Sequence, residues 1–220
     1  MRAVIFDYGN VLSRPQEPAE IAAMAASLNL PRDRFEQIYW RYRLAYDEGK
    51  LDPFEYWNHF GSVTPSQIEQ LNRIDGLSWT HPQASMVDWA CQLRQAGFQI
   101  ALLSNMPFTV RDAVLGCKWL PEFDQRTFSC ELRISKPAPE IYEHCLRGLG
   151  VAAVDALFLD DRAANVQGAK AVGMYSILFN SPEELAAELT VKFDLPQPGA
   201  VTLKSVDEKD DERRGTASDR

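Results

Sequence analysis

Four groups of polar residues stand out in this sequence, because each follows a short apolar run or lies on a loop beyond one. They are Asp7, Ser104-Asn105, Lys136 and Asp160-Asp161. Asp7 is the first candidate for chemistry, since it follows the apolar run over 3–6 and precedes a turn that contains glycine. If Asp7, Asp160 and Asp161 share one crevice, their carboxylates repel one another, so one would take up a proton unless a cation intervened.

Short buried strands would have to bring these groups together. The run over 3–6 has no polar residue to face water, which is typical of a central strand in a parallel sheet. Further strands are expected over 98–103, 126–129, 156–159 and 175–179, with helices over 82–95, 108–115, 139–148 and 163–172. This alternation predicts an α/β fold with a doubly wound parallel sheet. The carboxyl ends of parallel strands share one edge, so distant residues can converge there.

The segment 14–80 shows a helical pattern instead, with helices expected over 19–28, 35–46, from residue 53, and over 65–71. Aromatic and aliphatic residues recur at three- and four-residue steps over 35–46, which indicates an amphipathic helix. Tyr42, Tyr46 or Trp57 could stack on a ligand, but aromatic residues at this spacing more often form the core between helices. We expect that core here, and we assign no role to His59.

Composition narrows the classes of protein and partner. The chain has 220 residues, 45% of them hydrophobic, which suffices for one good core and a smaller accessory unit. A net charge of -8 and a pI near 5.0 argue against nucleic acid or an anionic membrane as a partner. Four scattered cysteines, and no leader or membrane-spanning pattern, favour a cytoplasmic protein. Residues 196–220 are rich in charge and are expected to form a disordered tail.

Each polar group also has a purely structural explanation. Asp7 could begin a tight turn, because Asp, Asn and Gly are common turn residues. Ser104-Asn105 and Asp160-Asp161 could each cap a following helix, and Lys136 could be an exposed surface lysine. A functional explanation is favoured because all four groups occur at predicted strand ends or on the loops beyond them.

In this order and spacing, the four groups resemble the motifs of the haloacid dehalogenase-like hydrolases. The matching residues are Asp7-Tyr8-Gly9-Asn10-Val11-Leu12, Ser104-Asn105, Ser135-Lys136-Pro137, and Asp160-Asp161 with Asn165 and Gly168-Ala169. The resemblance covers about residues 1–190 and is greatest to the sugar-phosphate phosphatase branch, whose first motif also reads Asp-x-Gly-Asn. It implies a Rossmann-like core over 1–13 and 81–195, with a helical cap over 14–80.

The resemblance implies a Mg²⁺-dependent phosphatase that acts on a small phosphate ester. Asp7 would be the nucleophile, and water would then hydrolyse the phosphoaspartyl intermediate. Asp7, the main-chain carbonyl of Gly9 and Asp161 would hold Mg²⁺, with Asp160 as a direct ligand or one shell further out.

The remaining motif residues are implied to bind the phosphate group. Ser104 and Asn105, with nearby main-chain N–H groups, would contact the phosphate oxygens. Lys136 would neutralise charge on Asp7 and on the transferring phosphoryl group. Asn165 would order the last loop by hydrogen bonding.

The sequence departs from the family pattern at Gly9. Most phosphatases of this family carry a second Asp there, which protonates the leaving alcohol and later activates water. General acid–base catalysis contributes about 10²- to 10⁴-fold. Three outcomes stay open: substrates with better leaving groups, such as sugar 1-phosphates, a proton supplied by the cap or by water, or a weak or inactive binding protein. Metal-free dehalogenation of a 2-haloacid is an enzyme alternative, although the extra carboxylates of Asp160 and Asp161 disfavour an anionic substrate without a metal.

Overall fold

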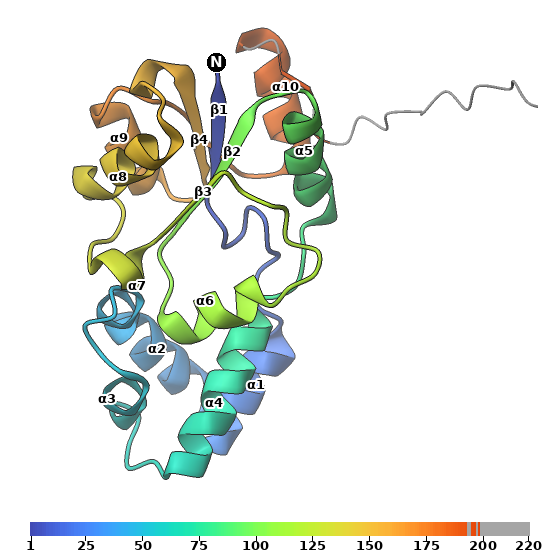
Figure 1. Ribbon diagram of the computed structural model, residues 1–220. Helices are drawn as coiled ribbons and strands as arrows, with labels where there is room; N and C mark the ends of the chain where they lie inside the picture. Colours follow the sequence, from blue (N-terminus) through green and yellow to red (C-terminus); the bar gives the residue numbers. More distant parts are fainter. Residues whose placement is uncertain (193–194, 197, 199–220) are drawn as a thin grey trace, which may run out of the picture.

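The protein is described here from a computed structural model, which covers residues 1–192, 195, 196 and 198. A five-stranded parallel sheet lies at its centre, in the order β3-β2-β1-β4-β5 (Figure 1). Its strands are β1 (Ala3–Phe6), β2 (Gln99–Ser104), β3 (Gln125–Phe128), β4 (Ala156–Asp160) and β5 (Tyr175–Leu178). The sequence order changes direction on either side of β1, so the predicted doubly wound parallel sheet is confirmed.

Helices cover both faces of the sheet. On one side lie α5 (Ala84–Gln95) and α10 (Pro182–Lys192), and on the other α8 (Pro139–Leu149) and α9 (Ala163–Ala171) (Figure 1). Alternate residues of β1 point to opposite faces: Val4 and Phe6 join the cluster under α5, and Ala3 and Ile5 join the cluster under α8. This two-sided burial explains why the strand is apolar throughout.

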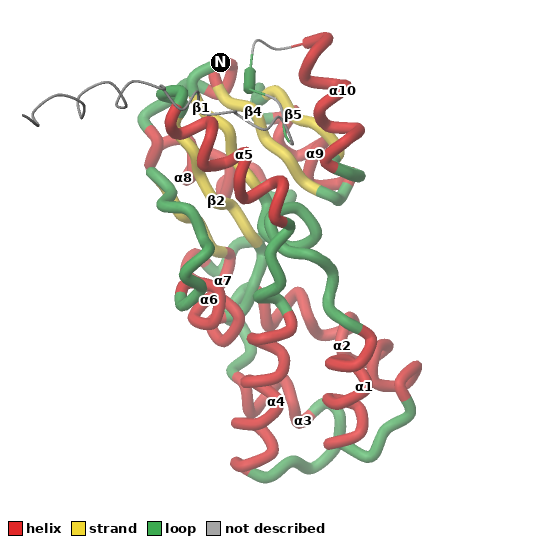
Figure 2. The backbone as a smooth tube through the Cα atoms, turned by 90° about the vertical axis from the view of Figure 1, so that its right-hand side faces the viewer, coloured by secondary structure: helices red, strands yellow, loops and turns green. Residues whose placement is uncertain are grey.

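A separate group of helices follows β1 in the chain. It consists of α1 (Pro18–Ser27), α2 (Arg32–Asp47), α3 (Pro53–Asn58) and α4 (Pro65–Ser78). These helices share their own apolar cluster and lie beyond the carboxyl edge of the sheet (Figure 2). Tyr46 and Trp57 are buried in that cluster, which confirms the expectation that the aromatic stripe is core.

The helical group is connected to the sheet by two chain segments that run side by side. Ser13 and Pro82 form an antiparallel bridge, and the main-chain N–H of Arg14 donates to His81 O at 2.8 Å. We therefore propose the boundaries of the cap at this crossing, close to the predicted limits of 14 and 80.

One difference from the predicted elements arises from packing. Helix α4 runs seven residues beyond the expected end at Leu71, because its last turns pack on α6 (Phe108–Leu115). A Cβ on Gly76 would lie 3.0 Å from Ala113 Cβ, so this glycine permits the close approach. Helix α7 (Ser129–Leu132), the 3-10 turn Ala153–Asp155 and α10 were not predicted. The predicted tail 196–220 lies outside the described residues, except for positions 196 and 198. No helix in the described part of the chain is long and apolar enough to cross a membrane.

Candidate active site

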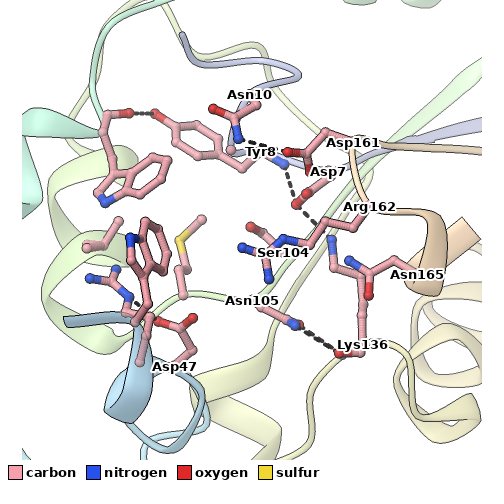
Figure 3. A pocket seen from close by; sticks show the side chains of 16 residues that line it. Asp7, Tyr8, Asn10, Asp47, Ser104, Asn105, Lys136, Asp161, Arg162 and Asn165 are labelled. Atoms are coloured by element: carbon pink, nitrogen blue, oxygen red, sulfur yellow. Dashed lines mark hydrogen bonds and ion pairs between the residues drawn. The ribbon is translucent and has the colours of Figure 1, made fainter. Parts of the chain in front are cut away.

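The carboxyl ends of β1, β2 and β4 open into one pocket between the sheet and the helical group. Because the three strands are parallel neighbours, Asp7, Ser104 and Asp160 emerge at the same edge. The pocket is open to solvent and holds about 560 Å³ of space, part of which is solvent outside its walls. Its walls include Asp7, Ser104 and Lys136 from the sheet side (Figure 3). The predicted convergence of distant polar residues is therefore observed.

Lys136 is the buried cation of this site. Its Nζ lies 2.7 Å from Asp7 Oδ1 and 2.7 Å from Asp160 Oδ2, and it donates to Leu103 O at 2.9 Å. The three acceptors match the three donors of an ammonium group. Burial acts to lower the pKa of Lys136, but the charges of Asp7 and Asp160 outweigh it, so the pKa is raised. Lys136 is therefore charged and fixed, and the alternative of an exposed surface lysine is wrong.

Asp7 is held in one orientation by two contacts on the same oxygen. Its Oδ1 accepts the N–H of Tyr8 at 2.7 Å and contacts Lys136 Nζ. Burial raises the pKa of Asp7 to about 7, and the neighbouring charge of Asp160 adds to this, while Lys136 opposes it. Because both contacts are made by Oδ1, Oδ2 is the oxygen that can react or bind a cation.

The three carboxylates of the site differ in their hydrogen bonding. One oxygen each of Asp7, Asp160 and Asp161 lies within 4.8 Å of the others. Asp160 accepts bonds from Asn165 Nδ2 at 3.0 Å on both oxygens and from the N–H of Arg162 at 2.8 Å, besides its contact with Lys136.

By contrast, Asp161 accepts one side-chain bond, from Asn10 Nδ2 at 2.8 Å. Carboxylate oxygens at this spacing are the donor set that Mg²⁺ prefers, and a divalent cation would offset their mutual repulsion. The residues present therefore fit Mg²⁺, with Asp7 and Asp161 less committed to other partners than Asp160 is.

Ser104 and Asn105 lie side by side but have different surroundings. Ser104 is 2% exposed and lines the pocket, and its hydroxyl has no hydrogen-bond partner among the described residues. Asn105 uses both ends of its amide on the main chain of Lys136: Nδ2 donates to Lys136 O at 3.0 Å, and Oδ1 accepts from Lys136 N at 2.9 Å. The side chain of Asn105 thus holds the Lys136 loop, so a phosphate contact at this position falls to its main-chain N–H.

Gly9 stands where the family pattern has an acid. A Cβ at this position would meet the ring of Trp79, with Cζ3 at 3.3 Å. Tyr8 fixes the chain that carries Trp79, because its hydroxyl donates to Trp79 O at 2.7 Å. The ring of Trp79 therefore borders the space that an acidic side chain at position 9 would enter.

The other wall of the pocket comes from the helical group, and the sequence analysis missed it. Trp40, Arg43 and Asp47 of α2 line the pocket, as does Trp79 after α4. Asp47 is labelled in Figure 3. Arg43 and Asp47 lie four residues apart on a helix that carries an aromatic stripe, and both are buried. A charged pair at helical spacing within an aromatic stripe was a signal that could have found them.

Comparison with known proteins shows the family of this chain. A family model described as haloacid dehalogenase-like hydrolase matches residues 1–173. The chain is 25% identical over 182 residues to a sesquiterpene phosphatase of Aspergillus oryzae, covering 80% of this chain and 88% of that protein. It is 24% identical over 209 residues to a D-ribitol-5-phosphate phosphatase of Bacteroides thetaiotaomicron, covering 87% and 98%. With acyl-CoA dehydrogenase family member 10 of Mus musculus it shares 27% identity over 213 residues, which is 89% of this chain but 19% of the mouse protein.

Solved structures show the same fold. A HAD family enzyme from Bacteroides thetaiotaomicron superposes with a TM-score of 0.70 at 17% identity, covering 86% of this chain and 98% of that one. The same enzyme in complex with magnesium and inorganic phosphate gives 0.67 at 18% identity, covering 82% and 94%. An L-2-haloacid dehalogenase from Xanthobacter autotrophicus gives 0.65 at 20% identity, covering 89% and 85%. With its Asp7, Ser104, Lys136 and Asp160-Asp161 groups gathered at one sheet edge, this chain belongs to the haloacid dehalogenase-like hydrolases.

Proposed function

We propose that this hydrolase is a Mg²⁺-dependent phosphatase that acts on a small phosphate ester through a phosphoaspartyl intermediate on Asp7. The observation that carries the proposal is the buried Lys136 between Asp7 and Asp160, with Asp161 in the same carboxylate group. Two relatives that match most of the chain are phosphatases by name.

In the proposed reaction, Oδ2 of Asp7 attacks phosphorus while the bond from phosphorus to the leaving oxygen breaks. Mg²⁺, held by Asp7, Asp161 and the main-chain carbonyl of Gly9, would offset the negative charge of the carboxylates and the phosphate. Lys136 favours the ionised form of Asp7 against the effect of burial and orients it, since its ammonium contacts Asp7 Oδ1. The unpartnered hydroxyl of Ser104 donates to a phosphate oxygen. Asp160 acts through Lys136, because its two oxygens are already hydrogen-bonded.

The carboxylate group also argues against a 2-haloacid as substrate. One oxygen each of Asp7, Asp160 and Asp161 lies within 4.8 Å of the others, and Asp7 and Asp161 line the pocket, so a carboxylate substrate without a metal would add further repulsion. A phosphate ester that brings a divalent cation with it removes this difficulty. A sugar 1-phosphate is the substrate to test first, since its leaving group demands less help from an acid at position 9.

The test is phosphate release from a panel of sugar phosphates, acyl phosphates and aryl phosphates, with Mg²⁺ and with excess chelator. We expect release that needs Mg²⁺ and is lost in Asp7→Asn, while Asp88→Asn on the exposed face of α5 keeps it. Full activity of Asp7→Asn would rule out the phosphoaspartyl route. If the protein releases chloride from a 2-haloacid at the same rate with and without chelator, the dehalogenase function would be favoured instead.

A further inference from the structure

One carboxylate in the pocket is not part of the carboxylate group at the sheet edge. Among the described residues that line the pocket, the acidic ones are Asp7, Asp47 and Asp161. Asp7 and Asp161 belong to the group that could hold a metal ion, and Asp47 does not. Asp47 comes from the end of α2 and lies across the pocket from Asp7 (Figure 3). In an in-line displacement the leaving oxygen would lie on the side of phosphorus away from Asp7, which is the side of the pocket where Asp47 lies.

The end of α2 is fastened to the sheet side, so the position of Asp47 is well defined. Ser129 Oγ donates to the main-chain O of Asp47 at 2.5 Å. Ser135 Oγ donates to Glu48 Oε1 at 2.7 Å, one residue further along. These two bonds tie Asp47 to the segment that carries Lys136, although the two residues come from different parts of the fold.

The side chain of Asp47 is set up to hold a proton. Its Oδ1 accepts from Arg43 Nε at 2.7 Å, and Arg43 also pairs with Asp75 at 3.1 Å, so one guanidinium serves two buried carboxylates. Oδ2 has no hydrogen-bond donor among the described residues. Burial raises the pKa of Asp47 to about 7, against the effect of Arg43. The charged and titratable groups that act on it are Arg43 and Tyr46 of α2, Tyr56 of α3, Asp75 of α4, and Arg162 after β4.

The other polar groups of the pocket are poor candidates for proton transfer. Lys136 is charged and bonded to three acceptors. Tyr8 gives its proton to Trp79 O, and no histidine is among the described residues that line the pocket. Gly9 has no side chain to donate, and arginine side chains do not lose their proton in proteins.

We propose that Asp47 takes the place of the missing acid at position 9 and protonates the leaving-group oxygen of the substrate. This inference rests on the proposed phosphatase function and assigns the proton transfer in it. In the first step, the bond from phosphorus to Asp7 Oδ2 forms, the bond to the leaving oxygen breaks, and the Asp47 proton goes to that oxygen. In the second, water attacks phosphorus, its proton goes to the Asp47 carboxylate, and the bond from phosphorus to Asp7 breaks. Inorganic phosphate leaves and both residues return to their starting states.

The test uses Asp47→Asn, with Asp33→Asn on the exposed side of the same helix as the matched control. Two substrates are compared in the presence of Mg²⁺: the best alkyl phosphate from the panel and p-nitrophenyl phosphate, whose leaving group needs no proton. We expect Asp47→Asn to lower kcat for the alkyl phosphate by about 10²- to 10⁴-fold. The initial release of p-nitrophenolate should stay within about tenfold of wild type, as a burst followed by slow turnover. Mass spectrometry should then find a phosphoryl group on the variant, and none on Asp7→Asn/Asp47→Asn.

A rescue variant separates chemistry from structure. Gly9→Asp in the Asp47→Asn background restores an acid at the family position, and its Cβ alone requires Trp79 to move by a few tenths of an ångström. It should recover part of the alkyl phosphate activity. An equal loss on both substrates without a burst would overturn the proposal, as would unchanged activity of Asp47→Asn. A wild type that hydrolyses p-nitrophenyl phosphate but no alkyl phosphate would overturn it too. Phosphate release by Asp7→Asn with repeated turnover would instead refute the phosphatase proposal itself, so the two failures can be distinguished.

Discussion

Replacing Lys136 by methionine tests the central electrostatic feature of the site. The change keeps most of the side-chain volume and removes the ammonium that contacts Asp7 and Asp160 at 2.7 Å each. Asp160 is fully buried and Asp7 is 7% exposed, so water cannot replace the lost cation at Asp160. Removing one partner of a buried ion pair costs about 3–5 kcal/mol. In a domain of this size each kcal/mol lowers Tm by about 2–4 °C, so we expect a drop of roughly 6–20 °C.

The assay is thermal and urea unfolding followed by circular dichroism, at fixed pH and without divalent cation. Lys118→Met, at an exposed position after α6, is the matched control and should change stability by no more than about 0.5 kcal/mol. The double variant Lys136→Met/Asp160→Asn removes one of the stranded charges and should recover part of the loss. A loss below about 1 kcal/mol in Lys136→Met, or no recovery in the double variant, would refute the buried cation as the partner of both carboxylates.

Three further predictions follow from the same contacts. Ser104→Ala removes a hydroxyl without a partner among the described residues, so the free energy of unfolding should hardly change. The kcat/KM for phosphate esters should fall about 10- to 100-fold, and inhibition by inorganic phosphate should weaken to a similar degree. A variant that binds phosphate like wild type would contradict this role. Burial raises the pKa of Asp47 from 3.8 to about 7, so folding favours its protonated form, and this contribution is complete below pH 4 and lost as pH rises to 7. The stability of Asp47→Asn relative to wild type should therefore improve by roughly 1.4 kcal/mol per pH unit across that window in urea unfolding, and a constant difference would show that Asp47 is ionised throughout. Gly168→Ala places a Cβ 2.8 Å from Pro137 O, so it should shift the loop that carries Lys136 and lower both stability, by about 1–3 kcal/mol, and phosphatase turnover. The control Gly116→Ala, whose Cβ would come no closer than 3.4 Å to Ala113 O, should leave turnover unchanged.

Most elements of the core were predictable from local patterns. The apolar run over 3–6 becomes β1 at the centre of the sheet, and the helix expected over 108–115 is α6 with the same limits. These predictions succeeded because burial on both faces and helical periodicity leave direct traces in neighbouring residues. Helix α4 was predicted too short, because its last turns are stabilised by contact with α6, which is distant in sequence. Such a contact leaves no local trace.

By itself the sequence determined the order of the polar groups, and the rule that parallel strands share an edge placed Asp7, Ser104 and Asp160 together. Only the tertiary structure decided which contacts each of these groups makes. It showed that Lys136 lies between two carboxylates and that the Asn105 amide is hydrogen-bonded to the main chain of Lys136. It also showed that the Ser104 hydroxyl has no hydrogen-bond partner among the described residues. It also brought Asp47 to the pocket, through helix packing and the bond from Ser129 to its main chain. The reason is physical: strand direction is encoded locally, whereas burial, hydrogen-bond partners and pKa depend on residues that only folding brings into contact.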